Sequence, residues 1–304
     1  MPKISVILAT YNEERNIKDC LETVKWADEI VLVDGKSEDR TVEIAKKYTK
    51  RIFVRKNPLM FHKNKQFAIE KAKGDWILYL DADERVTEEL KKEIFSIISS
   101  SSPLNGYWIP RKNIIFGKWI KHAGWYPDFQ LRLFKNGKAY LPCQSVHEQP
   151  VLEGKAGYLK SPLLHYNYQT INQFIQKMLI YTENEKNFLL SQGKRVTPFD
   201  AIRFPKEEFL KRFFLQKGYK DGLHGLVLSL LQALSALVLF AKIWEERRFK
   251  EEKGTLFFKK TVLEFRKFFK EFRHWSLKTE ILGEKKSFLR EVWFKIKLRL
   301  PFGW

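Results

Sequence analysis

Cysteine is scarce in this chain of 304 residues, which holds only Cys20 and Cys143. Two cysteines so far apart provide neither a disulfide framework nor the closely spaced ligands of a zinc site. We therefore expect both to be reduced thiols in a cytoplasmic protein. Residues 1–11 contain a short apolar stretch with no basic n-region and no cleavage site. We expect a first strand here rather than a signal peptide, and a chain that stays on the cytosolic side of any membrane.

The glycine-rich loop of dinucleotide-binding proteins is also missing. Residues 9–14 read Ala-Thr-Tyr-Asn-Glu-Glu, with no glycine and two acids at the end. A pyrophosphate at a helix N-terminus needs bare backbone amides, so this loop argues against a dinucleotide cofactor. Two interpretations remain open. Either Glu13 hydrogen-bonds a base or a ribose, or Asn12 caps the next helix while Glu13 and Glu14 complement its dipole.

Acidic residues are outnumbered, with 36 Asp and Glu against 56 Lys and Arg and a net charge of +20. This excess indicates an anionic partner, which is nucleic acid, an anionic membrane surface or a phosphorylated substrate. Residues 242–304 alone hold 18 basic and 9 acidic side chains, interleaved with Phe, Trp and Leu. That mixture favours an anionic membrane surface, and we expect no nucleic-acid partner.

The first hundred residues alternate between strand-like and helix-like segments, which predicts an α/β fold with a Rossmann-like, mostly parallel sheet. The expected strands are 4–9, 29–33, 51–54 and 76–80, and the expected helices are 14–26, 37–47 (capped by Ser37) and 63–73. Residues 106–167 are extended and rich in Trp, Tyr, Pro and Gly, and the chain beyond Thr170 is mainly helical in pattern. We expect one domain over 1–170 and a helical region over 171–304.

An uncharged apolar run over residues 225–241 is the main feature of the helical region. As a helix it would measure roughly 26 Å, whereas a spanning helix needs about 20 apolar residues. We favour a helix that lies in one leaflet, and a buried core or oligomer helix and a true span stay open. Phe and Val recur with helical spacing among basic residues over 258–273, and Leu, Val and Ile do so over 289–299, as in amphipathic helices on anionic lipid.

The most informative segment is an apolar run, residues 77–80, that ends in Asp81 and Asp83. Such a run is typical of a central parallel strand, and ligands bind beyond the carboxyl ends of these strands. Two neighbouring acids are costly to desolvate unless a cation lies between them, and Mg²⁺ prefers carboxylate and phosphate oxygens. The alternative is an acidic loop before a helix that Thr87 caps. Glu13 and Asp34 follow two other expected strands, so a nucleotide site at this edge is the better interpretation.

Three motifs together carry a family resemblance: Thr10-Tyr11-Asn12-Glu13, Asp34-Gly35-x-Ser37-x-Asp39-x-Thr41 and Asp81-Ala82-Asp83-Glu84. They resemble the signatures of family 2 inverting glycosyltransferases, whose domain has the GT-A fold. The string over residues 74–86 is similar to that of the subgroup that adds sugars to the lipopolysaccharide inner core, including β-1,4-glucosyltransferases. The resemblance covers roughly residues 1–170. Beyond it, Lys217-Gly218-Tyr219-x-Asp221-Gly222 matches less specifically.

The resemblance implies roles for individual residues. Asp34 would bind the base edge, Asp81 would face the ribose or donor sugar, and Asp83 would ligate Mg²⁺ or Mn²⁺ at the diphosphate. His165 would contact the metal or diphosphate, although a core histidine bonded to a carbonyl is nearly as good an interpretation. The remaining donor-site residues would be Thr10, Tyr11, Glu13, Asn64, Lys65 and Ala82.

An inverting transferase also needs a base that deprotonates the acceptor hydroxyl. Glu148 is the first candidate and Asp128 the second, and this chain has His147-Glu148 where the family commonly has Glu-Asp. The resemblance implies transfer of a hexose, with glucose the first candidate, from a nucleotide sugar such as a UDP-hexose to a lipid-linked saccharide. The enzyme would lie on the cytoplasmic face of the inner membrane, peripheral or monotopic, with a membrane-associating helical extension. A polyprenyl-phosphate glycosyltransferase and a non-catalytic nucleic-acid- or lipid-binding protein are the alternatives.

Overall fold

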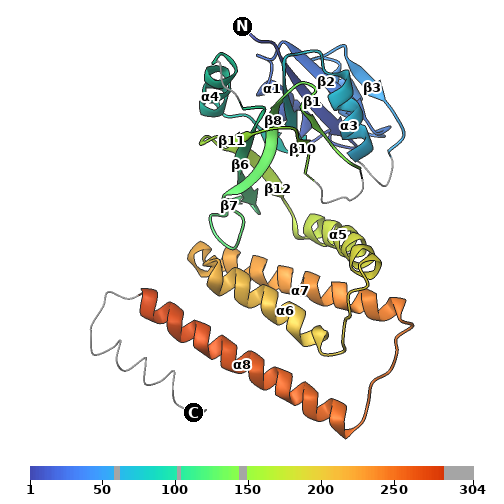
Figure 1. Cartoon of the computed structure of the whole chain (residues 1–304), viewed down its shortest axis with the longest axis vertical. Helices are drawn as coiled ribbons and strands as arrows, with labels where there is room; N and C mark the ends of the chain where they lie inside the picture. Colours follow the sequence, from blue (N-terminus) through green and yellow to red (C-terminus); the bar gives the residue numbers. More distant parts are fainter. Residues whose placement is uncertain (58–61, 101–103, 144–148, 284–304) are drawn as a thin grey trace. The chain divides into compact units, whose positions relative to one another are not determined.

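The computed structural model describes residues 1–57, 62–100, 104–143 and 149–283. The chain divides into two compact units (Figure 1). The first contains residues 1–121 and 125–169, and the second contains residues 122–124 and the chain from Thr170 onward. The functional roles predicted for the two parts stay predictions.

The first unit is built on a mixed sheet in the order β3-β2-β1-β4-β8-β6-β12-β5, with β7 and β11 also paired to β6. The strands β1 to β4 are mutually parallel, as predicted, and β8 is inserted antiparallel between β4 and β6. The bounds are β1 (Ile4–Thr10), β2 (Glu29–Asp34), β3 (Ile52–Val54), β4 (Trp76–Leu80), β5 (Glu84–Arg85), β6 (Gly106–Ile115), β7 (Lys118–Trp119), β8 (Asp128–Lys135), β11 (Ala156–Tyr158) and β12 (Leu163–Tyr168). A separate ribbon pairs β9 (Ala139–Tyr140) with β10 (Val151–Leu152).

Both faces of the central strands are buried, which explains their continuous apolar sequences. In β4, Leu78 and Leu80 belong to one hydrophobic cluster, while Ile77 and Tyr79 belong to a second. The first cluster includes residues of α1 (Ile17–Glu22), α2 (Thr41–Ala45) and α4 (Glu88–Ile98), and the second includes residues of α3 (His62–Lys71). The buried part of β4 ends at Leu80, and this places Asp81 at the carboxyl edge of the parallel strands.

Two of the predicted helices are shorter than expected. The helix predicted over 14–26 begins only at Ile17, and the one predicted from Ser37 begins only at Thr41. The prediction that Ser37 caps a helix is wrong, because its hydroxyl donates to the carboxylate of Asp34 at 2.6 Å. The predicted cap Thr87 is confirmed, since its Oγ1 accepts the backbone N–H of Leu90 at 3.1 Å.

The second unit is helical, as predicted. It contains α5 (Ile171–Ser191), α6 (Asp200–Leu210), a π-helical turn (Lys211–Leu215), a 3₁₀ turn (Gly218–Asp221), α7 (Leu223–Glu246) and α8 (Thr255–Gly283). The apolar run lies within α7. Among the described residues, α7 is the one helix with the length and composition to cross a membrane, and 28% of its apolar window is buried. This finding leaves the leaflet, core and spanning interpretations open.

The amphipathic pattern over 258–273 lies within one helix, α8. Ion pairs join it to α6, from Arg203 to Glu264 at 2.7 Å and from Lys206 to Glu271 at 3.0 Å. Its apolar side chains are unequally covered. Phe258 is 67% exposed and Phe269 is 55% exposed. The second predicted amphipathic segment, 289–299, lies outside the described residues.

Candidate active site

The segment Asp81-Ala82-Asp83 forms a tight turn between β4 and β5. The N–H of Glu84 donates to the carbonyl of Asp81 at 3.0 Å, and the N–H of Asp81 donates to Glu84 Oε2 at 2.9 Å. The Arg85 guanidinium donates to the carbonyl oxygens of Ala82 and Glu84 at 2.8 and 2.9 Å. Glu84 and Arg85 are both buried. The two buried residues that follow the turn therefore hold it in place through hydrogen bonds.

Asp81 lies between two cations. Lys65 Nζ on α3 is 2.6 Å from one carboxylate oxygen, and an Arg132 nitrogen on β8 is 2.5 Å from the other. The same Arg132 nitrogen donates to Glu84 at 2.8 Å. Burial acts to raise the pKa of Asp81, but the Arg132 and Lys65 charges outweigh it and hold that pKa well below its usual range. Asp81 is therefore a carboxylate with two cationic partners.

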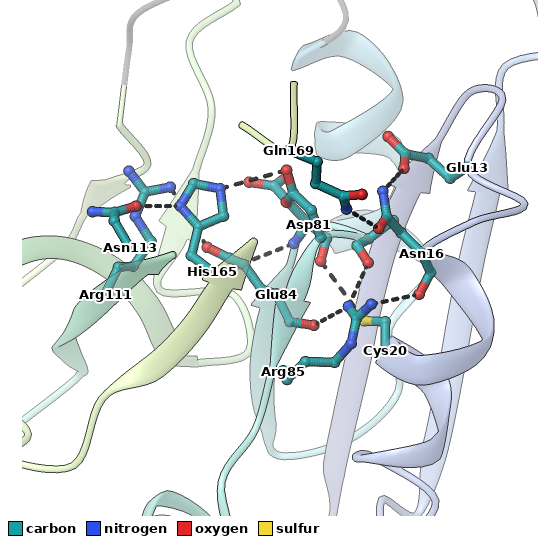
Figure 2. A network of polar contacts seen from close by, with 12 residues as sticks. Glu13, Asn16, Cys20, Asp81, Glu84, Arg85, Arg111, Asn113, His165 and Gln169 are labelled. Atoms are coloured by element: carbon teal, nitrogen blue, oxygen red, sulfur yellow. Dashed lines mark hydrogen bonds and ion pairs between the residues drawn. The ribbon is translucent and has the colours of Figure 1, made fainter. Parts of the chain in front are cut away.

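Asp83 lies beside a histidine of strand β12. Strand β12 pairs with β5, and the N–H of Tyr166 donates to the Asp83 carbonyl at 2.9 Å. This pairing brings His165 Nε2 to 3.5 Å from a carboxylate oxygen of Asp83. The other ring nitrogen, Nδ1, is 2.6 Å from Oδ1 of Asn113 on β6 (Figure 2). His165 and Asn113 are both buried.

Asp128 lies at the start of β8 and is held mainly by Arg111 on β6. Two guanidinium nitrogens of Arg111 lie 2.9 and 2.6 Å from Oδ2, and the Asn113 amide donates to the same oxygen at 3.1 Å. Burial acts to raise the pKa of Asp128, but the Arg111 charge outweighs it and lowers that pKa. A carboxylate with a lowered pKa is a weaker base. These contacts therefore suit Asp128 to holding Arg111 and Asn113 in place.

On the other side of the turn, two loops after β1 and β2 are joined by hydrogen bonds. The N–H groups of Asn12, Glu13 and Glu14 donate to the side chains of Ser37, Thr41 and Asp39 at 2.8, 2.7 and 3.0 Å, and the N–H of Glu38 donates to Asn12 Oδ1 at 2.9 Å. These contacts show that Asn12 does not cap α1. The motif over residues 34–41 thus holds the acidic loop after β1 in place.

The buried carboxylate of Asp34 stands at the base of these loops. It accepts the hydroxyl of Ser37 at 2.6 Å, the N–H of Ser37 at 2.8 Å and the hydroxyl of Thr10 at 3.3 Å. Asp34 therefore orders the loop after β2 as well as marking the end of that strand. Tyr11, one residue beyond Thr10, is 44% exposed.

A model of the "Glycosyl transferase family 2" family matches residues 5–153. The chain contains a family 2 glycosyltransferase domain. This confirms the resemblance to the family, and the sheet and its helices fit the predicted GT-A class. A lipopolysaccharide core biosynthesis glycosyltransferase, LpsC of Rhizobium meliloti (strain 1021), is 28% identical over 258 residues, which cover 82% of this chain and 96% of LpsC.

Two further proteins are similar to this chain. An uncharacterized glycosyltransferase of Rickettsia typhi (strain ATCC VR-144 / Wilmington) is 29% identical over 257 residues, covering 81% of this chain and 88% of the relative. Among solved structures, residues 1–349 of S. aureus TarS in complex with UDP match with a TM-score of 0.44 and 16% identity. That match covers 83% of this chain and 93% of the other.

The predicted site residues form two groups, one around the Asp81–Asp83 turn and one at the loops after β1 and β2, and Asn16 links the two. Figure 2 shows the link: Asn16 donates to Glu13 at 2.8 Å, and its carbonyl accepts from Arg85, which holds the Asp81–Asp83 turn, at 2.9 Å. Asn64 is buried on α3 and donates to the carbonyl of Lys56 at 3.2 Å. Glu148, the first candidate for the base, lies outside the described residues, and so does His147.

The sequence prediction missed three residues of this network: Asn16, Arg85 and Asn113. Arg85 follows the acidic motif directly, so its position was a usable signal. Asn113 is a polar residue within the extended stretch Lys112-Asn113-Ile114-Ile115, and its environment follows from the pairing of β6 with β8 and β12. Within the described ranges, no group of three or more His, Cys, Asp or Glu side chains is arranged to hold a metal ion.

Proposed function

We propose that this family 2 glycosyltransferase is a metal-dependent, inverting hexosyltransferase. It would transfer a hexose from a UDP-hexose to a lipid-linked saccharide such as the lipopolysaccharide core, on the cytoplasmic face of the inner membrane. The observation that carries the proposal is the Asp83–His165 pair at the carboxyl edge of the sheet, 3.5 Å apart. The name of the LpsC relative supports the acceptor class.

The donor set fits a divalent cation. Asp83 offers a carboxylate oxygen and His165 an imidazole nitrogen, and these two atoms lie 3.5 Å apart. Mg²⁺ and Mn²⁺ are usually held by one or two protein ligands together with substrate phosphates and water, so a diphosphate would supply the ligands that this pair lacks. When bound, the metal would act as a Lewis acid that neutralises charge on the departing nucleoside diphosphate.

The residues around the pair would hold the donor. Thr10, Tyr11, Glu13 and Asp34 would form the nucleoside side, where the hydrogen-bonded loops after β1 and β2 give a preorganised surface. Asp81 would face the ribose or donor sugar as a carboxylate, with Ala82 beside it, Lys65 as its cationic partner and Asn64 on the same helix. A site fixed before the substrate arrives loses less entropy on binding.

The inverting step needs a base on the face of the sugar opposite the leaving group. We retain Glu148 as the first choice. Asp128 is the weaker choice because Arg111 lowers its pKa and its oxygens are engaged by Arg111, Asn113 and Gln130. Gln149, the residue after Glu148, contacts Gln130, which in turn donates to Asp128 at 2.8 Å.

Nucleotide binding with and without metal tests the proposal. Calorimetric titration of the full chain with UDP should show binding that requires Mn²⁺ or Mg²⁺. Asp83→Asn should remove that dependence and lower hexose transfer by about 100-fold or more, because a Lewis acid contributes several kcal/mol to such a step. Asp75→Asn is the matched control, since Asp75 accepts the N–H of Lys3 at 2.7 Å at the opposite end of β4.

The alternatives give different results in the same titration. UDP affinity that is equal with and without metal, or Asp83→Asn activity within several-fold of the wild type, would contradict the metal assignment. Metal-independent binding of DNA with a steep salt dependence would favour the non-catalytic alternative. A screen of nucleotide sugars against lipid A–core and polyprenyl phosphate acceptors then identifies the sugar and separates the two acceptor classes.

A further inference from the structure

Asn113 is a buried amide whose orientation is determined by its neighbours. Its Nδ2 group donates to the carbonyl of Trp125 at 2.7 Å and to a carboxylate oxygen of Asp128 at 3.1 Å. A carbonyl and a carboxylate can only accept hydrogen bonds, so the NH₂ group must face them. The amide oxygen, Oδ1, is thereby directed to His165 Nδ1, at 2.6 Å.

The orientation of the amide fixes the position of a proton on His165. Oδ1 of Asn113 has no hydrogen to donate, so a 2.6 Å contact with Nδ1 requires that Nδ1 carry the hydrogen. In a neutral imidazole with hydrogen on Nδ1, the other nitrogen has a lone pair. That nitrogen, Nε2, faces the Asp83 carboxylate at 3.5 Å, where a second acceptor gains nothing without a cation between them.

We propose that Asn113 is a positioning residue that holds His165 in the Nδ1–H tautomer, so that Nε2 is presented to a metal beside Asp83. Arg111 and Asp128 support it, because Arg111 fixes the carboxylate that accepts from the Asn113 amide. The role in metal binding rests on the proposed function, whereas the tautomer is a property of the metal-free chain. This role also gives Asp128 a function other than that of a base.

Removing the amide should change both the ring and the metal affinity. In Asn113→Leu, a side chain of similar size, Nδ1 has no acceptor at residue 113. The hydrogen is then free to move to Nε2, where it would donate to Asp83 and occupy the position of the metal. Loss of a residue that orients a metal ligand typically lowers metal affinity by about 10- to 100-fold.

Nuclear magnetic resonance of the imidazole nitrogens tests the tautomer directly. The spectrum is recorded on metal-free, ¹⁵N-histidine-labelled full chain in mildly alkaline buffer. The signal of His165 is assigned with His165→Gln. We expect hydrogen on Nδ1 in the wild type and on Nε2 in Asn113→Leu. Calorimetric titration with Mn²⁺ in the presence of UDP should show the fall in affinity.

Asn136→Leu is the matched control. Asn136 also donates through Nδ2 to two carbonyl oxygens, those of Ala72 and Gly74 at 3.1 and 3.0 Å, but it lies at the opposite end of β4. This variant should lose stability without changing the His165 signal or the Mn²⁺ affinity. Asn113→Asp keeps an acceptor for Nδ1 and should keep the tautomer, although it loses the donor to Trp125 and Asp128 and should cost stability.

The outcomes separate this inference from the proposed function. Hydrogen on Nε2 of His165 in the wild type, alone or together with Nδ1, would overturn it, and that measurement needs no variant to fold. An Asn113→Leu protein with an unchanged tautomer and unchanged Mn²⁺ affinity would overturn it as well. A tautomer that changes as expected in a chain that binds no metal would support the role of Asn113 while contradicting the metal assignment.

Discussion

Arg132 is the residue on which the charge balance beside the Asp81–Asp83 turn depends. It is buried, and one of its nitrogens contacts the carboxylates of Asp81 and Glu84 at 2.5 and 2.8 Å. Breaking a buried ion pair by removing one partner typically costs about 3–5 kcal/mol, because the remaining charge is left without compensation. In Arg132→Met, Asp81 would keep Lys65 at 2.6 Å, whereas the fully buried Glu84 would keep Arg111 at the longer distance of 3.6 Å. We therefore expect this variant to lower the free energy of unfolding by about 3 kcal/mol, the lower end of that range, at neutral pH.

The pH dependence of this loss follows from the lowered pKa of Asp81. A carboxyl group with a lowered pKa in the folded state stabilises the protein above its unfolded pKa of about 3.9, and this contribution disappears as pH falls through the folded value. Arg132→Met removes one cause of the lowered pKa. The difference in unfolding free energy between wild type and variant should therefore shrink as pH falls below about 4.

Urea unfolding at neutral and acidic pH measures both effects. Arg40→Met is the control, because Arg40 and Glu43 form an exposed pair with side chains 67% and 56% exposed. Such pairs are worth about 0–1 kcal/mol, so the control should remain close to the wild type. A cost for Arg132→Met that is equal at neutral and acidic pH would contradict the pairing of Asp81 with Arg132.

Single residues of the site were predictable where they follow a strand. Asp81 and Asp83 were predicted to follow a strand because an apolar run ends at Leu80, and β4 does end there, whereas their roles in the site stay predictions. The contact from Arg132 to Asp81 was not predictable, because β8 enters the sheet antiparallel beside β4 and joins residues 51 positions apart. Asn113 was missed for the same reason, since its three partners come from two other segments, residues 125–128 and β12.

At the scale of elements, the loop after β1 is held by the loop after β2, and Thr41 is the most buried contact between them. Its Oγ1 accepts the N–H of Glu13 at 2.7 Å and donates to Asp39. Thr41→Val keeps the shape but removes both bonds, and an unsatisfied buried donor costs about 1–3 kcal/mol. We expect a loss of stability in that range and weaker UDP binding, because Glu13 lies on the nucleoside side of the proposed site.

Thr182→Val provides the comparison for this prediction. Thr182 is equally buried in α5, but its hydroxyl donates to carbonyl oxygens of its own helix, at 2.8 Å for Met178. The control should change stability slightly and leave UDP affinity unaltered. Equal UDP affinities for Thr41→Val and the wild type, measured by calorimetry, would show that Glu13 does not belong to the nucleoside site.

Whole elements were predicted well where one physical rule determines them. Both-face burial explains the strands, and the uncharged run identified the centre of α7. The helices after β1 and β2 were predicted too long, because Asn and Ser indicate a helix cap and a loop contact equally well in a sequence. Here Asn12 and Ser37 bond to each other's loops, and this alternative requires knowledge of which loops are neighbours.

At the scale of the whole molecule, the chain combines a net charge of +20 with an amphipathic helix, α8, that exposes aromatic side chains. Phe258 and Phe269 are 11 positions apart on α8, which places them three turns apart on one face. Lys259, Lys270 and Arg273 lie close to them in the sequence. Amphipathic helices of this composition typically bind anionic membrane surfaces through their apolar face and their basic residues together, and we propose this role for α8.

The full chain should therefore bind vesicles that contain phosphatidylglycerol and dissociate from them as salt is raised. Burial of a phenylalanine side chain contributes about 1.5–3 kcal/mol, and each basic residue near such a surface contributes about 1 kcal/mol. The double variant Phe258→Ser/Phe269→Ser should lower partitioning in a sedimentation assay by at least about 100-fold, with Val54→Ser as an exposed apolar control in the first unit. Equal partitioning of the double variant and the wild type would show that α8 is not the anchor, and α7 would then be the segment to test.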